Sequence, residues 1–172
     1  MTRRIPIIPA AARAWGLVAL VLLLTACSRA PDSGPGKVRW DRDTCARCAM
    51  AISDPKFSAQ VRAPDERGRS RLYKFDDIGC AVIWLDEHEL SDDPKVEVWV
   101  NDYHSGDWLD ARKAWYVAGQ ITPMGYGLGA TAEKEPGAMD FAAARRHIYK
   151  VEETYHQHRG EASHAHPQEQ TP

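Results

Sequence analysis

The chain has 172 residues, of which 44% are hydrophobic and 27% are charged. These proportions indicate one ordinary globular domain or two small ones, and they exclude a low-complexity or fibrous chain. The 22 basic and 24 acidic side chains give a net charge of −2, so nucleic-acid binding loses its main electrostatic support. Four cysteines are too few for a disulfide scaffold and need individual explanations.

Residues 1–26 have the layout of a secretory signal peptide. Three arginines lead into an apolar run, Trp15 to Ala26. As a helix this run would span about 18 Å, which is too short for a hydrocarbon core of about 30 Å. The run ends in Leu24-Thr25-Ala26-Cys27, which resembles the bacterial lipobox, whose cysteine is lipidated and becomes the new N-terminus. The alternative is an ordinary signal peptide with a chance cysteine after its cleavage site.

The lipobox predicts an anchored protein outside the cytoplasm. Two acyl chains on Cys27 would hold it at the membrane, and Ser28 favours the outer membrane over the inner one. Without residues 1–26 the chain has 19 basic and 24 acidic side chains and a net charge of −5, in a compartment that permits disulfides. Residues 27–39 are polar and contain several Pro and Gly, which predicts a flexible tether; a coil from Cys27 to Cys45 would reach roughly 20–25 Å.

The folded body is predicted to be α+β. Residues 58–63 and 69–75 alternate between apolar and polar types around a turn-forming segment, which predicts a hairpin. Asp76 is the expected N-cap of a helix that runs to about Leu90. A further alternating segment, 95–100, predicts a strand, so the order is β, β, α, β. The expected buried stripe of the helix is Ile78, Ala81, Val82 and Leu85.

The second half of the body repeats this order more faintly. Strands are expected at 114–118 and 128–132, and a helical pattern runs from Met139 to Tyr155. We therefore interpret residues 40–155 as two related halves, about 40–104 and 105–155. Residues 156–172 lack an apolar period, which predicts disorder. Their histidines form either a weak metal-collecting arm or simply a polar tail: His156, His158, His164 and His166.

The strongest chemical feature is Cys45-Ala-Arg-Cys48-Ala-Met50. It offers two thiols and a thioether, and such soft ligands select Cu(I) over hard and borderline ions. Thiolates bind strongly after losing protons, whereas a thioether binds more weakly. The mixture therefore suits a carrier that must release its metal. A second thioether, Met124, lies in a Pro-Met-Gly loop and is either a third ligand or a core residue that fills a gap.

Other interpretations of the cysteines compete with this one. A thioredoxin-like pair would follow a strand and begin a helix, whereas this motif follows the tether. A c-type haem site needs His at position 49, which is Ala49, and a zinc site needs a second ligand pair. A Cys45–Cys48 disulfide is the main rival, although it gives Met50 no role. Cys80 is expected to be a small buried hydrophobe. The chain shows no hydrolase triad, zincin motif, phosphate-binding loop or dinucleotide fingerprint, which disfavours an enzyme.

These features resemble the NosL family of lipoproteins, which are encoded with the nitrous oxide reductase system. The resemblance runs from about Cys27 to Tyr155 and rests on the lipobox, the tether, the cysteine motif, the stretch Tyr73-Lys-Phe-Asp-Asp-Ile-Gly-Cys80 and the Pro-Met-Gly loop. It implies an α+β fold of two related ββαβ-type modules packed together, like those of the organomercurial lyase MerB.

The resemblance also implies a function and a site. The protein would be a Cu(I) chaperone for the copper–sulfide CuZ centre of periplasmic nitrous oxide reductase. The family's copper motif falls on Cys48 and Met50, with Cys45 as its companion and Met124 as the ligand from the second half. The expected partners are the reductase apoprotein and the ABC-transporter complex of the same system. The alternatives are a thiol-disulfide redox protein that uses Cys45 and Cys48, and a structural assembly scaffold.

Overall fold

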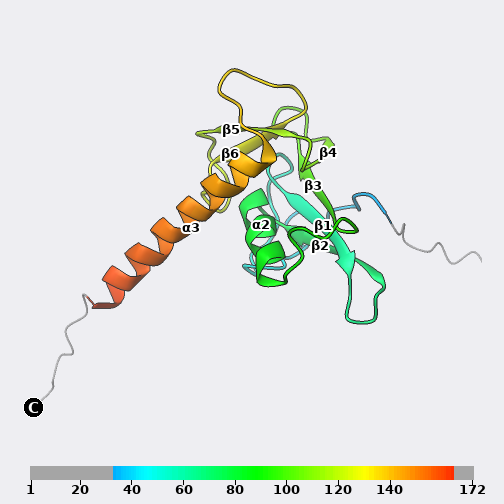
Figure 1. Ribbon diagram of the computed structural model, residues 1–172, viewed down its shortest axis with the longest axis horizontal. Coiled ribbons are helices and arrows are strands. Elements are labelled where there is room, and N and C mark those ends of the chain that lie inside the picture. The colour runs from blue at the N-terminus through cyan, green and yellow to red at the C-terminus, as the bar shows by residue number, and fades with distance from the viewer. Residues whose placement is uncertain (1–32, 165–172) are drawn as a thin grey trace, which may run out of the picture. The chain divides into compact units, whose positions relative to one another are not determined.

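A computed structural model describes residues 33–164 of the chain, with side chains to residue 157 (Figure 1). The expected signal peptide, the expected lipidation residue Cys27 and residues 165–172 lie outside the described residues. The elements in chain order are β1 (Ala59–Pro64), β2 (Ser70–Phe75), α2 (Ile78–Glu87), β3 (Glu97–Asn101), β4 (Trp108–Asp110), β5 (Trp115–Ala118), β6 (Leu128–Thr131) and α3 (Phe141–His164).

The larger sheet has four antiparallel strands in the order β2-β1-β3-β4. The predicted hairpin is confirmed as β1 and β2, which pair from Ala59 opposite Phe75 to Pro64 opposite Ser70. β3 lies on the other side of β1, where Val61 and Val98 are opposite each other and both buried. β4 was not expected from the sequence, because three residues are too few to show an alternating pattern.

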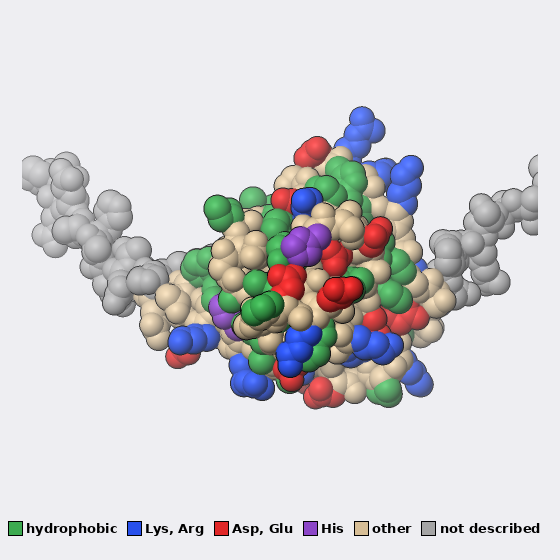
Figure 2. Space-filling view, turned by 90° about the horizontal axis from the view of Figure 1, so that it is seen from above, with side chains coloured by type: hydrophobic (Ala, Val, Ile, Leu, Met, Phe, Trp, Pro, Cys, Tyr) green, Lys and Arg blue, Asp and Glu red, His purple; other side chains and the backbone are tan. Residues whose placement is uncertain are grey.

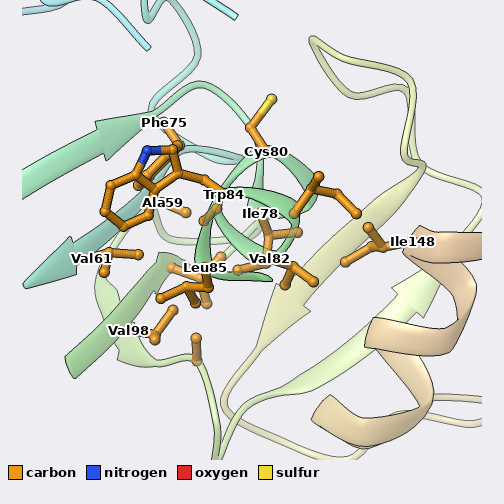
Figure 3. Close-up of a cluster of buried hydrophobic side chains, with 14 of the residues drawn as sticks. Ala59, Val61, Phe75, Ile78, Cys80, Val82, Trp84, Leu85, Val98 and Ile148 are labelled. Carbon is orange, nitrogen blue, oxygen red and sulfur yellow. The ribbon is translucent and has the colours of Figure 1, made fainter. Parts of the chain in front are cut away.

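Helix α2 lies beside this sheet (Figure 1). All eight residues from Ile78 to Leu85 are buried, because the sheet covers one side of the helix and α3 contacts it from another. Figure 3 shows Ile148 of α3 near Ile78 and Val82 of α2. The N-cap is Asp77 and not the expected Asp76: the Asp77 side chain accepts a hydrogen bond from the Gly79 N–H. Asp76 instead accepts one from the Ser53 N–H at 3.1 Å.

The second half consists of a two-stranded antiparallel sheet, β5-β6, followed by α3. A bridge between Asp102 and Ala130 joins the two sheets. β4 pairs with β3 although it lies beyond the expected boundary at 104, and no strand follows α3 within residues 33–164. The α+β class therefore holds with antiparallel sheets and two helices, but the ββαβ repeat is not confirmed.

Helix α3 continues beyond Tyr155, where the sequence pattern predicted the folded body to end. Its last helical residue is His164, so the helix includes the first part of the His-rich segment. Across residues 33–164, neither helix has both the length and the apolar character needed to span a bilayer. On the face that Figure 2 shows, acidic and basic side chains are intermixed, which agrees with the small net charge.

The expected tether is bound to the larger sheet from Gly34 onwards. The Gly34 N–H donates to the Glu97 carboxylate at 2.7 Å, and the Arg62 guanidinium donates to the Gly34 carbonyl. Gln60 is fully buried and forms two hydrogen bonds with the Gly36 backbone, at 2.7 and 2.8 Å. The flexible stretch predicted to reach residue 39 therefore ends several residues earlier, because side chains of β1 and β3 satisfy its backbone groups.

Candidate metal centre

The cysteine motif forms a tight loop before β1. The Cys45 N–H donates to the Met50 carbonyl at 2.8 Å, and the Ala49 N–H donates to the Cys45 carbonyl at 3.0 Å. Ala49 has a φ of 62°, a left-handed conformation that is uncommon outside glycine and reverses the chain within a few residues. The Ala46 N–H donates to the Lys74 carbonyl of β2 at 2.8 Å. The loop is thus fixed to the end of the strand that precedes α2.

The loop brings Cys45 and Cys48 to Cys80 in the first turn of α2. The three Sγ atoms all lie within 4.8 Å of one another, and all three residues are free cysteines. Cys45 and Cys80 are buried and Cys48 is half-buried. Figure 3 shows the Cys80 sulfur pointing away from Val61 and Val98.

The sequence pattern predicted only a core role for Cys80, so reasoning from the sequence missed a member of this cluster. All residues in this turn of the helix are apolar, so the sequence pattern does not show whether the Cys80 side chain faces the sheet or the motif loop. Cys80 follows the end of β2 at Phe75 by five residues, and this position could have indicated that it belongs to the cluster. That inference requires knowing that the motif loop is bonded to β2.

Of the predicted ligands, Cys45, Cys48 and Met124 come together. The Sδ atom of Met124 lies 3.9 Å from the Sγ atom of Cys48. Met124 is half-buried in the loop between β5 and β6, and its N–H donates to the Asp77 carboxylate at 3.4 Å. Met50 follows Cys48 by two positions, but its side chain is 53% exposed.

The pKa values of the three thiols differ in direction: that of Cys45 is lowered, and those of Cys48 and Cys80 are raised. A hydrogen bond from the Cys80 thiol, together with backbone N–H groups of Cys48, Asp76 and Arg47, outweighs the effect of burial and lowers the pKa of Cys45 to about 5. The same contact with Cys45, together with burial, raises the pKa of Cys80 far above its usual range. Burial raises the pKa of Cys48. Of the three thiols, Cys45 is therefore the one whose charged form its surroundings favour most, because backbone N–H groups stabilise that form.

A cavity of about 470 Å³ opens over the outer sulfurs of this centre. Cys48 and Met124 line it, whereas Cys45 and Cys80 do not. Its other lining residues are charged or aromatic: Arg47, Glu87, Tyr126, Glu152, Tyr155 and His156. A ligand that enters from solvent therefore meets Cys48 and Met124 before it meets the other two thiols.

Arg47 organises the wall of this cavity. Its guanidinium donates to Glu87 at the end of α2 at 3.1 Å, to the Tyr126 hydroxyl at 2.9 Å and to Glu152 of α3 at 2.5 Å. The Tyr126 hydroxyl also donates to Glu152 at 2.5 Å. One side chain of the cysteine motif thus connects both helices and the loop that contains Met124.

Fold and site together define a small α+β protein with a sulfur-rich centre suited to a soft metal ion. The sequence model of the NosL family matches residues 39–157, which include all of these sulfur residues and more than half of the chain. The chain belongs to the NosL family, and the resemblance seen in its sequence is confirmed.

A solved structure provides a further comparison. The crystal structure of the copper chaperone NosL from Shewanella denitrificans matches with a TM-score of 0.47 and 20% sequence identity, over 70% of this chain and 89% of that one. No curated protein matches the chain.

Proposed function

We propose that this protein is a Cu(I) chaperone that receives copper at Cys48 and Met124, with Cys45 as a second thiolate. The observation that carries the proposal is the 3.9 Å separation of the sulfurs of Cys48 and Met124, two residues that line the same open cavity. Thiolate and thioether sulfurs favour Cu(I). Membership of the NosL family supports copper as the cargo.

The arrangement suits transfer better than storage. Met124 is a neutral ligand with no proton to exchange, so it can leave the metal at little cost when an acceptor ligand enters through the cavity. Cys48 loses its proton when the metal binds, and acid therefore weakens the complex. Cys45 lies behind Cys48 and can keep the ion bound while the outer ligands exchange.

The family also supports a partner and a location for this function. We propose that the copper is delivered to apo nitrous oxide reductase for assembly of its CuZ centre, and that the ABC-transporter complex of the same system is a second partner. Diacylated Cys27 would anchor the protein at the periplasmic face of the outer membrane. Gly34 and Gly36 are bound to the larger sheet, so the described part of this segment is fixed to the folded body.

The thiol-disulfide alternative fits the geometry less well. A redox protein needs an exposed thiolate as its attacking group. Here Cys45, whose pKa is about 5, is only 2% exposed, while the pKa of the more accessible Cys48 is raised. Measurement of the Cys45–Cys48 reduction potential and of turnover with a thioredoxin-like donor tests this alternative, because rapid cycling with the donor would favour it.

Anaerobic competition for Cu(I) between the full chain and a chromogenic chelator tests the proposed function. Cys48→Ser is expected to weaken binding by about 100-fold and Met124→Leu by about tenfold, equivalent to about 2.7 and 1.4 kcal/mol. Met50→Leu is the matched control for a lost thioether, and we expect a smaller effect because Met50 is exposed. Binding by Cys48→Ser as tight as that of the parent would refute the assignment.

A further inference from the structure

We propose that Cys80 is a third thiolate ligand, and that Cys45, Cys48 and Cys80 form an inner trigonal Cu(I) position behind the outer Cys48–Met124 pair. This inference rests on the proposed function and deepens it. It gives the centre two positions that share Cys48, where the outer pair alone would provide one.

The spacing of the three sulfurs suits one small ion. Metal–thiolate bonds of about 2.3 Å place the sulfurs of a trigonal site about 4 Å apart. All three Sγ–Sγ separations are at or below 4.8 Å, so small side-chain rotations close the site without moving the backbone. Met124 is not needed to complete it.

Burial distinguishes the inner position from the outer one. Cys80 is 0% exposed and Cys45 is 2% exposed, and neither lines the cavity that Cys48 and Met124 face. The Cys80 sulfur points away from the apolar side chains of the sheet (Figure 3), so α2 presents it to the motif loop. An ion held there is shielded from water and from competing ligands.

The surroundings can accommodate the charge of the loaded site. Three thiolates around one Cu(I) carry a net charge of −2; the copper stays monovalent, and each sulfur that is still protonated releases its proton to solvent. The N–H groups of Arg47, Cys48 and Asp76 are directed at Cys45. These backbone dipoles lower the cost of the negative charge, whereas the Arg47 guanidinium in the adjacent cavity wall is already paired with Glu87 and Glu152.

Two positions that share Cys48 allow copper to move without being released. An ion bound to Cys48 and Met124 moves inward when Cys45 and Cys80 replace Met124, and it moves outward by the reverse exchange. The inner position retains the ion with three strong ligands, and the outer position presents it to an acceptor.

X-ray absorption at the copper edge tests this assignment on the full chain loaded anaerobically with one equivalent of Cu(I). We expect three sulfur ligands in the parent and still three in Met124→Leu, because Cys80 completes the site. The double variant Cys80→Ala with Met124→Leu should fall to two sulfurs. Two sulfurs in Met124→Leu alone, or three in the double variant, would overturn the proposal. Because Met124 is only half-buried, the Met124→Leu measurement does not depend on a substitution of a fully buried residue such as Cys80.

Chelator competition gives an independent measurement of affinity. With Met124→Leu present in both chains, adding Cys80→Ala is expected to weaken copper binding at least about tenfold, whereas adding Ala81→Ser, a change at the neighbouring buried position of α2, should leave it within twofold. Equal affinities for Met124→Leu with and without Cys80→Ala would also overturn the assignment. A parent that takes no copper from the chelator would instead refute the proposed function, so the two failures are distinguishable.

Discussion

The Sδ atom of Met124 lies 3.9 Å from the Sγ atom of Cys48, across 76 positions of sequence. Behind this contact, the Asp77 carboxylate accepts hydrogen bonds from the Gly79 N–H at the start of α2 and from the Met124 N–H. One buried carboxylate therefore positions both the helix that carries Cys80 and the loop that carries Met124.

Asp77→Ala should reduce both stability and copper affinity. Loss of an N-cap costs about 1 kcal/mol, and release of the Met124 loop should weaken Cu(I) binding about tenfold. Asp140→Ala is the matched control, because Asp140 accepts from the Ala143 N–H at 2.8 Å at the start of α3 but does not line the cavity. Urea unfolding and chelator competition measure the two effects. Equal copper affinities in the two variants would show that Asp77 does not position Met124.

Arg47→Met should loosen the contact between α3 and the cysteine motif. Arg47 is 20% exposed and has three hydrogen-bonding partners, including Glu152, so its loss removes three charge-assisted hydrogen bonds and leaves the Tyr126 hydroxyl bonded to Glu152 across this wall. We expect the free energy of unfolding to fall by about 2 kcal/mol and amide hydrogen exchange in α3 to accelerate.

Lys113→Met provides the control for Arg47→Met. Lys113 is 83% exposed and pairs with Asp110, and such surface pairs contribute about 0–1 kcal/mol. Similar losses for the two variants would mean that the Arg47 network adds no more than a surface ion pair.

Gln60→Leu should release the segment that precedes the cysteine motif. Gln60 is fully buried, and its side chain donates to and accepts from the Gly36 backbone. Removing these bonds leaves the half-buried N–H and carbonyl groups of Gly36 without this partner, at a cost of about 1–3 kcal/mol. Hydrogen exchange at the Gly36 amide should accelerate. Arg62→Met is the control: it loses the bonds to the Gly34 carbonyl, but the Gly36 amide should remain protected. If the Gly36 amide were equally protected in Gln60→Leu, Gln60 would not hold this segment on the sheet.

Asp102→Asn should change how acid affects stability. Burial acts to raise the pKa of Asp102, but N–H donors from Ser105, His104 and Ala132 outweigh it, so the pKa is lowered. The folded state therefore favours the charged form, and the resulting stability is present above the usual value of 3.8 and is lost as the pH falls through the lower folded value.

Urea unfolding of the metal-free chain between pH 5 and pH 2.5 measures this effect. The parent should lose stability more steeply than Asp102→Asn, which should be about 1–2 kcal/mol less stable at pH 7. Parallel curves would mean that the three N–H donors do not stabilise the charge of Asp102.

The sequence by itself determined the elements that rest on local patterns. Alternation and turn residues defined the β1–β2 hairpin, and the run from Ile78 to Leu85 defined α2, because both patterns are complete within a few residues. The cysteine motif indicated a soft metal for the same reason: the chemistry of sulfur does not depend on the fold.

Only the tertiary structure decided which sulfur atoms meet. Met50 belongs to the motif but has an exposed side chain, whereas Cys80 and Met124 are distant in sequence and lie beside the motif cysteines. The pairing of the motif loop with β2 and the Asp77 hydrogen bonds fix these positions, and neither leaves a periodic signal. The short strand β4 and the docking of Gly34 likewise depend on partners far along the chain, and such pairings follow from packing rather than from local preference.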